Sequence, residues 1–111
     1  MTSKFRNIPT EVDGIRFASK AEARRYQELK LLMRAGEIEN LELQKRYPLV
    51  VNGVKVGTYV SDFTYRERYQ DGPYTLHNEV DEDVKGVATP LFKLKAKLFR
   101  AQYGREIKII R

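Results

Sequence analysis

The segment from Ser19 to Ala35 limits the fold most strongly, because it carries both the start signal and the stop signal of an α-helix. Ser19 followed three residues later by Glu22 is a capping box, and Gly36 can adopt the left-handed conformation that ends many helices. Apolar side chains recur at helical spacing, so one face of this helix must be buried against another layer. This buried stripe is predicted to contain Tyr26, Leu29 and Met33.

Turn signals divide most of the remaining chain into short strands. Asn52-Gly53 lies between two valine-containing segments and is the strongest hairpin signal. Asp13-Gly14 and Asp71-Gly72-Pro73 predict two further turns. Strands are predicted over residues 38–47, 49–51, 54–56, 59–65, 74–85 and 106–110.

A second helix is predicted to begin at Thr89-Pro90, a capping residue followed by the residue best suited to the first helical position. Gly104 is expected to end it after Tyr103. The order is then a helix, three or four strands, a helix and a strand, in short α-β-β-β-α-β. It predicts an α/β (α+β) fold with a mixed central β-sheet flanked by two helices. A single domain of residues 1–111 is expected, with residues 1–11 as a flexible basic arm.

The composition restricts the classes of function. Hydrophobic residues make up 41% and charged residues 32% of the chain, which is typical of a globular protein rather than a disordered one. The absence of cysteine excludes a disulfide scaffold, a zinc-thiolate site and a cysteine nucleophile, and it fits the cytoplasm. No apolar run approaches the roughly 20 residues of a membrane span, so no membrane partner is expected. The net charge of +6 favours a polyanion such as nucleic acid.

Glu22 has a structural and a functional interpretation. The capping box alone accounts for a glutamate at this position. However, Glu22 is in line with Tyr26 and Leu29, which places it on the side of the helix that faces the sheet. A carboxylate on that side needs a pairing group or a bound cation, since burying it unpaired is costly.

Asp62, Asp83 and Lys85 are the other candidate site residues. Regular alternation places Asp62 on the same face of its strand as Val60 and Thr64, and an aspartate that protects an edge strand is the ordinary alternative. Asp83 and Lys85 are two residues apart on one predicted strand, so they share a face. The acidic run that precedes them can form a solvated face or a surface that binds cations.

Together these four residues predict a metal-dependent nuclease site. Two strand aspartates and a helical glutamate offer the carboxylate oxygens that Mg²⁺ prefers. A lysine beside them can orient or deprotonate an attacking water and offset the charge of a scissile phosphate. His77 is the only histidine, which excludes sites built on several histidines, and there is no glycine-rich phosphate loop.

The order of these residues resembles that of the PD-(D/E)xK nuclease superfamily. The resemblance rests on Ser19-Lys20-x-Glu22 opening a helix, Gln44 ending the next strand, Asp62 on a third strand, and Asp83-x-Lys85 on a fourth, followed by a basic helix. From about residue 12 to residue 103 the chain is also similar to a family of short phage proteins related to Holliday junction resolvases. The similar phrases are Ala35-Gly36-Glu37-Ile38, Leu41-Glu42-Leu43-Gln44 and Glu82-Asp83-Val84-Lys85-Gly86.

This resemblance implies a restriction-endonuclease-like core with Mg²⁺ or Mn²⁺ as cofactor. The implied metal ligands are Glu22, Asp62 and Asp83, with Lys85 as the catalytic lysine and Ser19 and Gln44 as accessory residues. Two positions depart from the superfamily pattern. Ser61 precedes Asp62 where proline is usual, and Asp83 replaces the commoner glutamate, which bears on metal preference. The expected location is the cytoplasm, that of the host if the chain is phage-encoded.

The basic residues are expected either to contact DNA phosphates on both sides of the site or to form a solubilising surface. The candidates for DNA binding are Lys4, Arg6, Lys20, Arg24, Arg25, Lys93, Lys97 and Arg100. Lys95 is different, because a helical wheel places it between Leu91 and Leu98 on the apolar side of the second helix. It can extend along apolar surface to solvent, or reach the metal site as an additional cation.

The sequence therefore predicts a Mg²⁺- or Mn²⁺-dependent endodeoxyribonuclease that hydrolyses phosphodiester bonds by water attack. By family analogy the substrate is four-way or branched DNA, and a homodimer would place two active sites on two strands. One alternative is a nickase or single-strand nuclease with the same site. Others are a non-catalytic DNA-binding module and a structural phage component.

Overall fold

The computed structural model of this protein describes residues 8–111, so Lys4, Arg6 and most of the expected N-terminal arm lie outside the described residues. Two short strands, β1 (Thr10–Val12) and β2 (Ile15–Phe17), form the first hairpin. Its turn is the predicted Asp13-Gly14, where both residues have positive φ, 53° and 75°. These two residue types tolerate that conformation, which explains the tight turn.

Both helices occupy the predicted segments. α1 (Lys20–Arg34) begins after Ser19, whose Oγ accepts a hydrogen bond from the backbone N–H of Glu22 at 3.2 Å. α2 (Pro90–Tyr103) is capped by Thr89 and ends at Gly104, which has a left-handed conformation. The buried residues of α1 are Ala23, Tyr26 and Leu29. The prediction for Met33 is wrong, because the buried part of α1 ends at Leu29 and Met33 remains 38% exposed.

Within residues 8–111, five strands lie between the two helices. β3 (Ile38–Leu43), β6 (Phe63–Asp71), β7 (Tyr74–Val84) and the C-terminal β8 (Lys108–Ile110) form a sheet in the order β3-β6-β7-β8. This sheet is mixed, because β8 runs parallel to β7 while the other pairs are antiparallel. β4 (Arg46–Val51) and β5 (Val54–Val60) form a separate hairpin around the predicted Asn52-Gly53 turn. The mixed sheet and the two helices agree with the predicted α/β (α+β) class. The expectation that both helices flank the central sheet is wrong for α2, which packs on the β4–β5 hairpin.

Two of the predicted strands are divided in the structure. Residues 38–47 contain β3 and the start of β4, which belong to different sheets. Residues 59–65 are interrupted at Ser61 and Asp62, because the chain there leaves β4 as its partner and joins β3 and β7. The predicted alternation around Asp62 is therefore wrong. The order α-β-β-β-α-β also omits the first hairpin and two of the strands between the helices.

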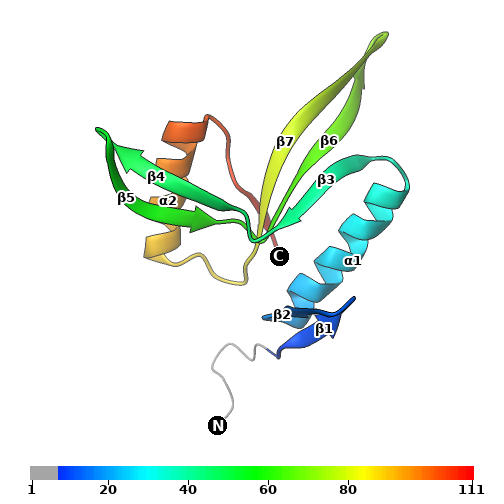
Figure 1. Cartoon of the computed structure of the whole chain (residues 1–111), viewed down its shortest axis with the longest axis horizontal. Coiled ribbons are helices and arrows are strands. Elements are labelled where there is room, and N and C mark those ends of the chain that lie inside the picture. Colours follow the sequence, from blue (N-terminus) through cyan, green and yellow to red (C-terminus); the bar gives the residue numbers. More distant parts are fainter. Residues whose placement is uncertain (1–7) are drawn as a thin grey trace.

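The hairpin β4–β5 and the sheet diverge from one region, which we call the crossing point and define as Gln44 and residues 61–62 (Figure 1). α1 packs on the sheet through a core that includes Phe17, Leu29 and Phe63. α2 packs on the β4–β5 hairpin through a second core of Tyr47, Leu49, Tyr59 and Phe99. The molecule extends over 56 × 40 × 21 Å, which reflects the two projecting hairpins. No helix in the described part of the chain is long and apolar enough to cross a membrane.

The C-terminal part of β7 carries three consecutive buried carboxylates, at residues 81, 82 and 83. Successive strand residues point to opposite faces, so these carboxylates meet different partners. Glu82 faces α1, where Arg25 Nε and Nη2 donate to its two carboxylate oxygens at 2.8 and 2.7 Å, and Tyr65 donates a further hydrogen bond. This bidentate pair ties α1 to the central strand.

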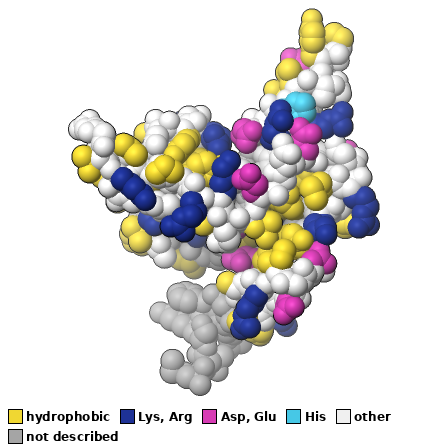
Figure 2. All heavy atoms as spheres, viewed as in Figure 1, with side chains coloured by type: hydrophobic (Ala, Val, Ile, Leu, Met, Phe, Trp, Pro, Cys, Tyr) yellow, Lys and Arg dark blue, Asp and Glu magenta, His cyan; other side chains and the backbone are white. Residues whose placement is uncertain are grey.

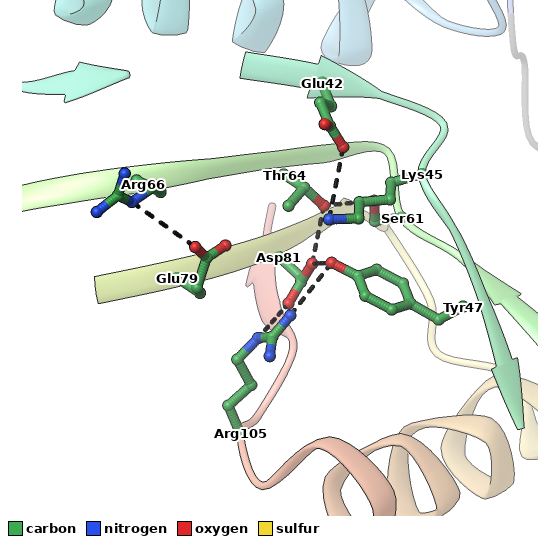
Figure 3. Close-up of polar contacts among 9 residues, drawn as sticks. All are labelled: Glu42, Lys45, Tyr47, Ser61, Thr64, Arg66, Glu79, Asp81 and Arg105. Atoms are coloured by element: carbon green, nitrogen blue, oxygen red, sulfur yellow. Dashed lines mark hydrogen bonds and ion pairs between the residues drawn. The ribbon is translucent and has the colours of Figure 1, made fainter. Parts of the chain in front are cut away.

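Asp81 lies on the opposite face and is completely buried. Arg105, from the segment between α2 and β8, donates to its Oδ2 through Nε at 2.7 Å. The hydroxyl groups of Tyr47 and Thr64 donate to its Oδ1 (Figure 3). The alternative of a solvated acidic face is thus wrong for Asp81 and Glu82, because each carboxylate is matched by an arginine from a distant part of the chain.

Candidate active site

The structure brings Glu22, Asp62, Asp83 and Lys85 together at the crossing point. Glu22 lies in the first turn of α1 and Asp62 between β5 and β6. Asp83 is near the end of β7, and Lys85 directly follows this strand. The Oδ2 atom of Asp62 accepts a hydrogen bond from the backbone N–H of Val84 at 2.8 Å, which fixes it against β7. The charge of Asp62 acts on both Glu22 and Asp83, so Asp62 is the central carboxylate of the three. A hydrogen bond between the side chains of Asp62 and Asp83 lowers the pKa of Asp62.

Burial is the main reason why the pKa of each of these carboxyl groups is raised. It raises the pKa of Asp83 to about 6, and repulsion from Asp62 adds to the effect. The pKa of Glu22 is raised by burial and then by Asp62. Burial also raises the pKa of Asp62, although the Val84 N–H and Lys85 act in the opposite direction. When all are ionised, three carboxylates and one ammonium group leave a formal charge of −2, which favours a divalent cation.

Lys85 is held close to these carboxylates. Its Nζ lies 3.6 Å from Asp83 Oδ1 and 4.3 Å from the centre of the Phe92 ring, and the side chain is only 26% exposed. Phe92 is in the first turn of α2, so the second helix positions the lysine through a cation–π contact. The ammonium group therefore belongs to the carboxylate cluster and not to the solvated surface.

Tyr59 and Phe92 are site residues that the sequence interpretation missed. The hydroxyl of Tyr59 donates to Asp83 Oδ2, and burial, followed by this hydrogen bond, raises the pKa of Tyr59. Tyr59 is 24 positions from Asp83 along the chain, and no local pattern signals such a contact. The position of Phe92 two residues after Pro90 was visible, but its contact with Lys85 depends on how α2 packs.

Gln44 and Lys95, the two accessory candidates apart from the cap residue, both border the cluster. The backbone N–H of Gln44 donates to the carbonyl of Asp62 at 3.3 Å, and its side chain lowers the pKa of Asp62. Gln44 has φ of 54°, a left-handed conformation that is unusual for this residue type and is often found at functional sites. Lys95 is half-buried and lines a hollow together with Asp83 and Lys85.

The cluster borders three adjoining hollows that share lining residues, and we call these hollows together the groove. A hollow of about 310 Å³ is lined by Glu22, Gln44 and Asp62. It shares Glu22 with a hollow of about 340 Å³ that reaches Lys85, and this one shares Lys85 and Thr89 with the third, of about 230 Å³. The capping residues of both helices, Ser19 and Thr89, border the groove. An extended anionic chain can thus pass the carboxylates, the lysine and two helix N-termini.

The structure separates the predicted DNA-binding residues into different environments. Lys20, Arg24 and Lys93 are exposed. Arg25 differs from the expectation, because its guanidinium is largely buried and engaged by Glu82, so it is not free to bind a phosphate. Arg100 pairs with Glu106 at 3.1 Å and, with Lys97, lines a hollow between α2 and β8 that shares only Phe92 with the groove.

The donor set fits a hard divalent cation in its chemistry but not in its present orientation. Among residues 8–111, no group of three or more histidine, aspartate or glutamate side chains is arranged to hold a metal ion. Protein groups engage the carboxylates instead, namely the N–H of Ala18 for Glu22, the N–H of Val84 for Asp62 and Tyr59 for Asp83. Metal binding therefore requires these side chains to turn toward a common point.

Asp83→Asn is expected to stabilise the metal-free protein more at pH 8 than at pH 5. The folded-state pKa of about 6 exceeds the unfolded value of 3.8, so the folded state holds more protons between about pH 4 and pH 6. The contribution of Asp83 to stability is then present at low pH and lost as the pH rises through 6. The full shift, 6 minus 3.8, corresponds to about 3 kcal/mol, reduced in the variant by the lost pairing with Lys85.

Thermal unfolding in chelator at both pH values tests this expectation, with wild type and Asp83→Asn side by side. A higher Tm of the variant at pH 8 would confirm that the site carries uncompensated charge. If the Tm of the variant is lower than that of wild type by the same amount at both pH values, the charge of Asp83 is already compensated in the wild-type protein.

Comparison with known proteins identifies the family of the chain. Neither the search of curated proteins nor the search of solved structures returns a match. A protein-family model matches residues 2–111, almost the whole sequence. The chain therefore belongs to the DUF1064 family, a family of proteins of unknown function.

Proposed function

We propose that this chain is a metal-dependent DNA endonuclease with a restriction-endonuclease-like core, as in the PD-(D/E)xK superfamily. The observation that carries the proposal is the convergence of three carboxylates and one lysine on an open groove, with the charge of Asp62 acting on both of the other carboxylates. Elsewhere in β7 the buried carboxylates are matched by arginines, whereas this cluster has only Lys85. Such an excess of buried negative charge is costly, and a bound cation would account for it.

The side chains of the cluster suit hydrolysis of a phosphodiester. Glu22, Asp62 and Asp83 would hold Mg²⁺ or Mn²⁺, which polarises the phosphate and lowers the pKa of water. Lys85 orients the attacking water and offsets charge on the scissile phosphate. In the reaction, the water oxygen bonds to phosphorus, one bridging P–O bond breaks, and the departing oxygen takes up a proton. The helix N-termini at Ser19 and Thr89 favour an anion in the groove.

The proposed substrate is branched or four-way DNA, cut by a homodimer. The net charge of +6 supports a polyanionic partner, and the exposed Lys20, Arg24 and Lys93 are available for phosphate contacts. The choice of branched DNA rests on the resemblance to short phage proteins related to junction resolvases.

Cleavage of labelled DNA tests the proposed function. Wild type and Asp62→Asn are compared with Mg²⁺, Mn²⁺ or chelator on a four-way junction, a splayed arm, a nicked duplex, a linear duplex and a single strand. Paired symmetric nicks in the junction alone, lost in the variant, are the expected result. Cutting of every substrate would retain the nuclease and remove junction specificity. Tight binding without any cutting would instead indicate a non-catalytic DNA-binding protein.

A further inference from the structure

We propose that the β4–β5 hairpin is a DNA-binding arm whose outward face follows the phosphate backbone beside the groove. This inference rests on the proposed nuclease function and adds a contact surface to it. From Leu43 to Ser61 the sequence contains three basic residues and not one aspartate or glutamate, in a chain that has 15 acidic residues. Such a segment offers a polyanion attraction without local repulsion.

Two of these basic residues share one face of the hairpin. Arg46, Pro48 and Val50 alternate with the buried Tyr47 and Leu49, so they point away from α2. The register of the hairpin shifts between Leu49 and Val50, so Lys55 is the cross-strand partner of Val50 and lies with it on the outward face. The hairpin thus presents Arg46 near its base and Lys55 near its tip.

Within the described part of the chain, neither of these two cations is paired with a carboxylate. Arg46 and Lys55 are both exposed, and neither forms an ion pair with any carboxylate of residues 8–111. Lys45, the third basic residue, lies 3.6 Å from Glu42 and is partly compensated. In Figure 2, Lys and Arg side chains are scattered over the lobe formed by β4, β5 and α2, whereas the acidic side chains seen in this view lie over the centre and the other parts of the molecule. Unpaired exposed cations gain most from contact with phosphates.

The base of the hairpin borders the proposed active site along β5, at a hollow that the first part of α2 also lines. Val60 is the cross-strand partner of Arg46, and Thr58 is that of Pro48. Thr58 and Val60 line the same part of the groove as Asp83 and Lys85. A strand that leaves the groove along the outward face would next meet Arg46 and then Lys55.

The length of the hairpin sets the extent of the contact. From Val60 to Val54, six steps at about 3.3 Å per residue give about 20 Å. At about 3.4 Å per base pair along a duplex, this reach corresponds to about six base pairs on one side of the cleavage site.

Salt-dependent binding and footprinting test the inference. Arg46→Gln/Lys55→Gln is introduced into the Asp62→Asn protein, and affinity for a labelled four-way junction and a linear duplex is measured in chelator at increasing KCl. We expect at least about a tenfold loss of affinity near 0.1 M salt, and a slope of log K against log salt that is smaller by about two. A hydroxyl-radical footprint should shorten by about six nucleotides on one side.

The matched control is Arg34→Gln/Arg68→Gln, which removes the same charge from the far end of α1 and the adjacent part of β6. An equal change of slope in this control would overturn the inference, because only net charge would then matter. If wild type cuts DNA but the hairpin variant keeps the salt slope and the footprint of the Asp62→Asn protein, the proposed DNA-binding arm is refuted and the proposed nuclease function is retained. If no metal supports DNA cleavage but the salt slope and the footprint change as expected, the DNA-binding arm is supported and the nuclease function is refuted.

Discussion

Lys85→Met is expected to lower the rate of metal-dependent DNA cleavage by about 10²- to 10⁴-fold, the range found for groups that assist proton transfer. Methionine retains apolar contact with Phe92 but removes the ammonium group that lies 3.6 Å from Asp83 Oδ1. The charge that offsets the scissile phosphate is thereby lost, while the carboxylates remain. Single-turnover cleavage at saturating protein separates this chemical effect from weaker binding.

Two lysines of α2 serve as controls for the general effect of removing a positive charge on the cleavage rate. Lys93→Met removes an exposed cation from the same helix and should leave the single-turnover rate close to that of wild type. Lys95→Met removes the cation that shares a hollow with Asp83 and Lys85, and an intermediate loss would place its ammonium group at the site. A rate for Lys85→Met as high as that for Lys93→Met would exclude Lys85 from catalysis.

Arg25→Met is expected to reduce the free energy of unfolding by about 3–5 kcal/mol, the usual effect of breaking a buried ion pair from one side. Glu82 is completely buried, and Arg25 supplies two of its three side-chain hydrogen bonds. Loss of the guanidinium leaves a buried carboxylate with only Tyr65 as donor. Urea unfolding followed by circular dichroism measures the change.

The neighbouring arginine provides the control for this stability effect. Arg24→Met alters an exposed residue of the same helix and should change stability by no more than about 0.5 kcal/mol. Arg25→Met/Glu82→Met removes both charges and should recover part of the loss, because no buried carboxylate is then left unpaired. Equal destabilisation by Arg24→Met and Arg25→Met would contradict a structural role of the pair.

The elements that the sequence predicted well are those set by local interactions. Ser19, Thr89 and Gly104 define helix ends through contacts within a few residues, and Asn52-Gly53 defines a turn by its own backbone preference. The strand 59–65 was predicted as continuous because its polar and apolar residues alternate, and this alternation does not show which strands pair with it. The change of pairing partner at Ser61 depends on β3, β4 and β7, which no local pattern describes.

The candidate site shows the same division. Glu22, Asp62, Asp83 and Lys85 were selected by their order along the chain, and the structure places them together. In the sequence, Asp83 differed from Asp81 and Glu82 only by its position two residues before a lysine. Their distinct roles depend on Arg105 and Arg25, each more than 20 positions away, so the separation of paired from unpaired carboxylates required the fold.

The alternating partners of the three consecutive carboxylates also constrain how the length of this chain can change. A shift of β7 by a single residue would put Glu82 in the place of Asp81, facing Tyr47 and Arg105, and Asp83 in the place of Glu82, facing Arg25. Each pocket would then hold a side chain of the wrong length. Deletions or insertions between Val80 and Val84 should therefore be rejected. The turn at Asp71-Gly72-Pro73 lies at the exposed end of a nine-pair ladder and can vary in length without moving that register. Variation in natural or engineered relatives of this chain should accordingly accumulate at the far end of the β6–β7 hairpin.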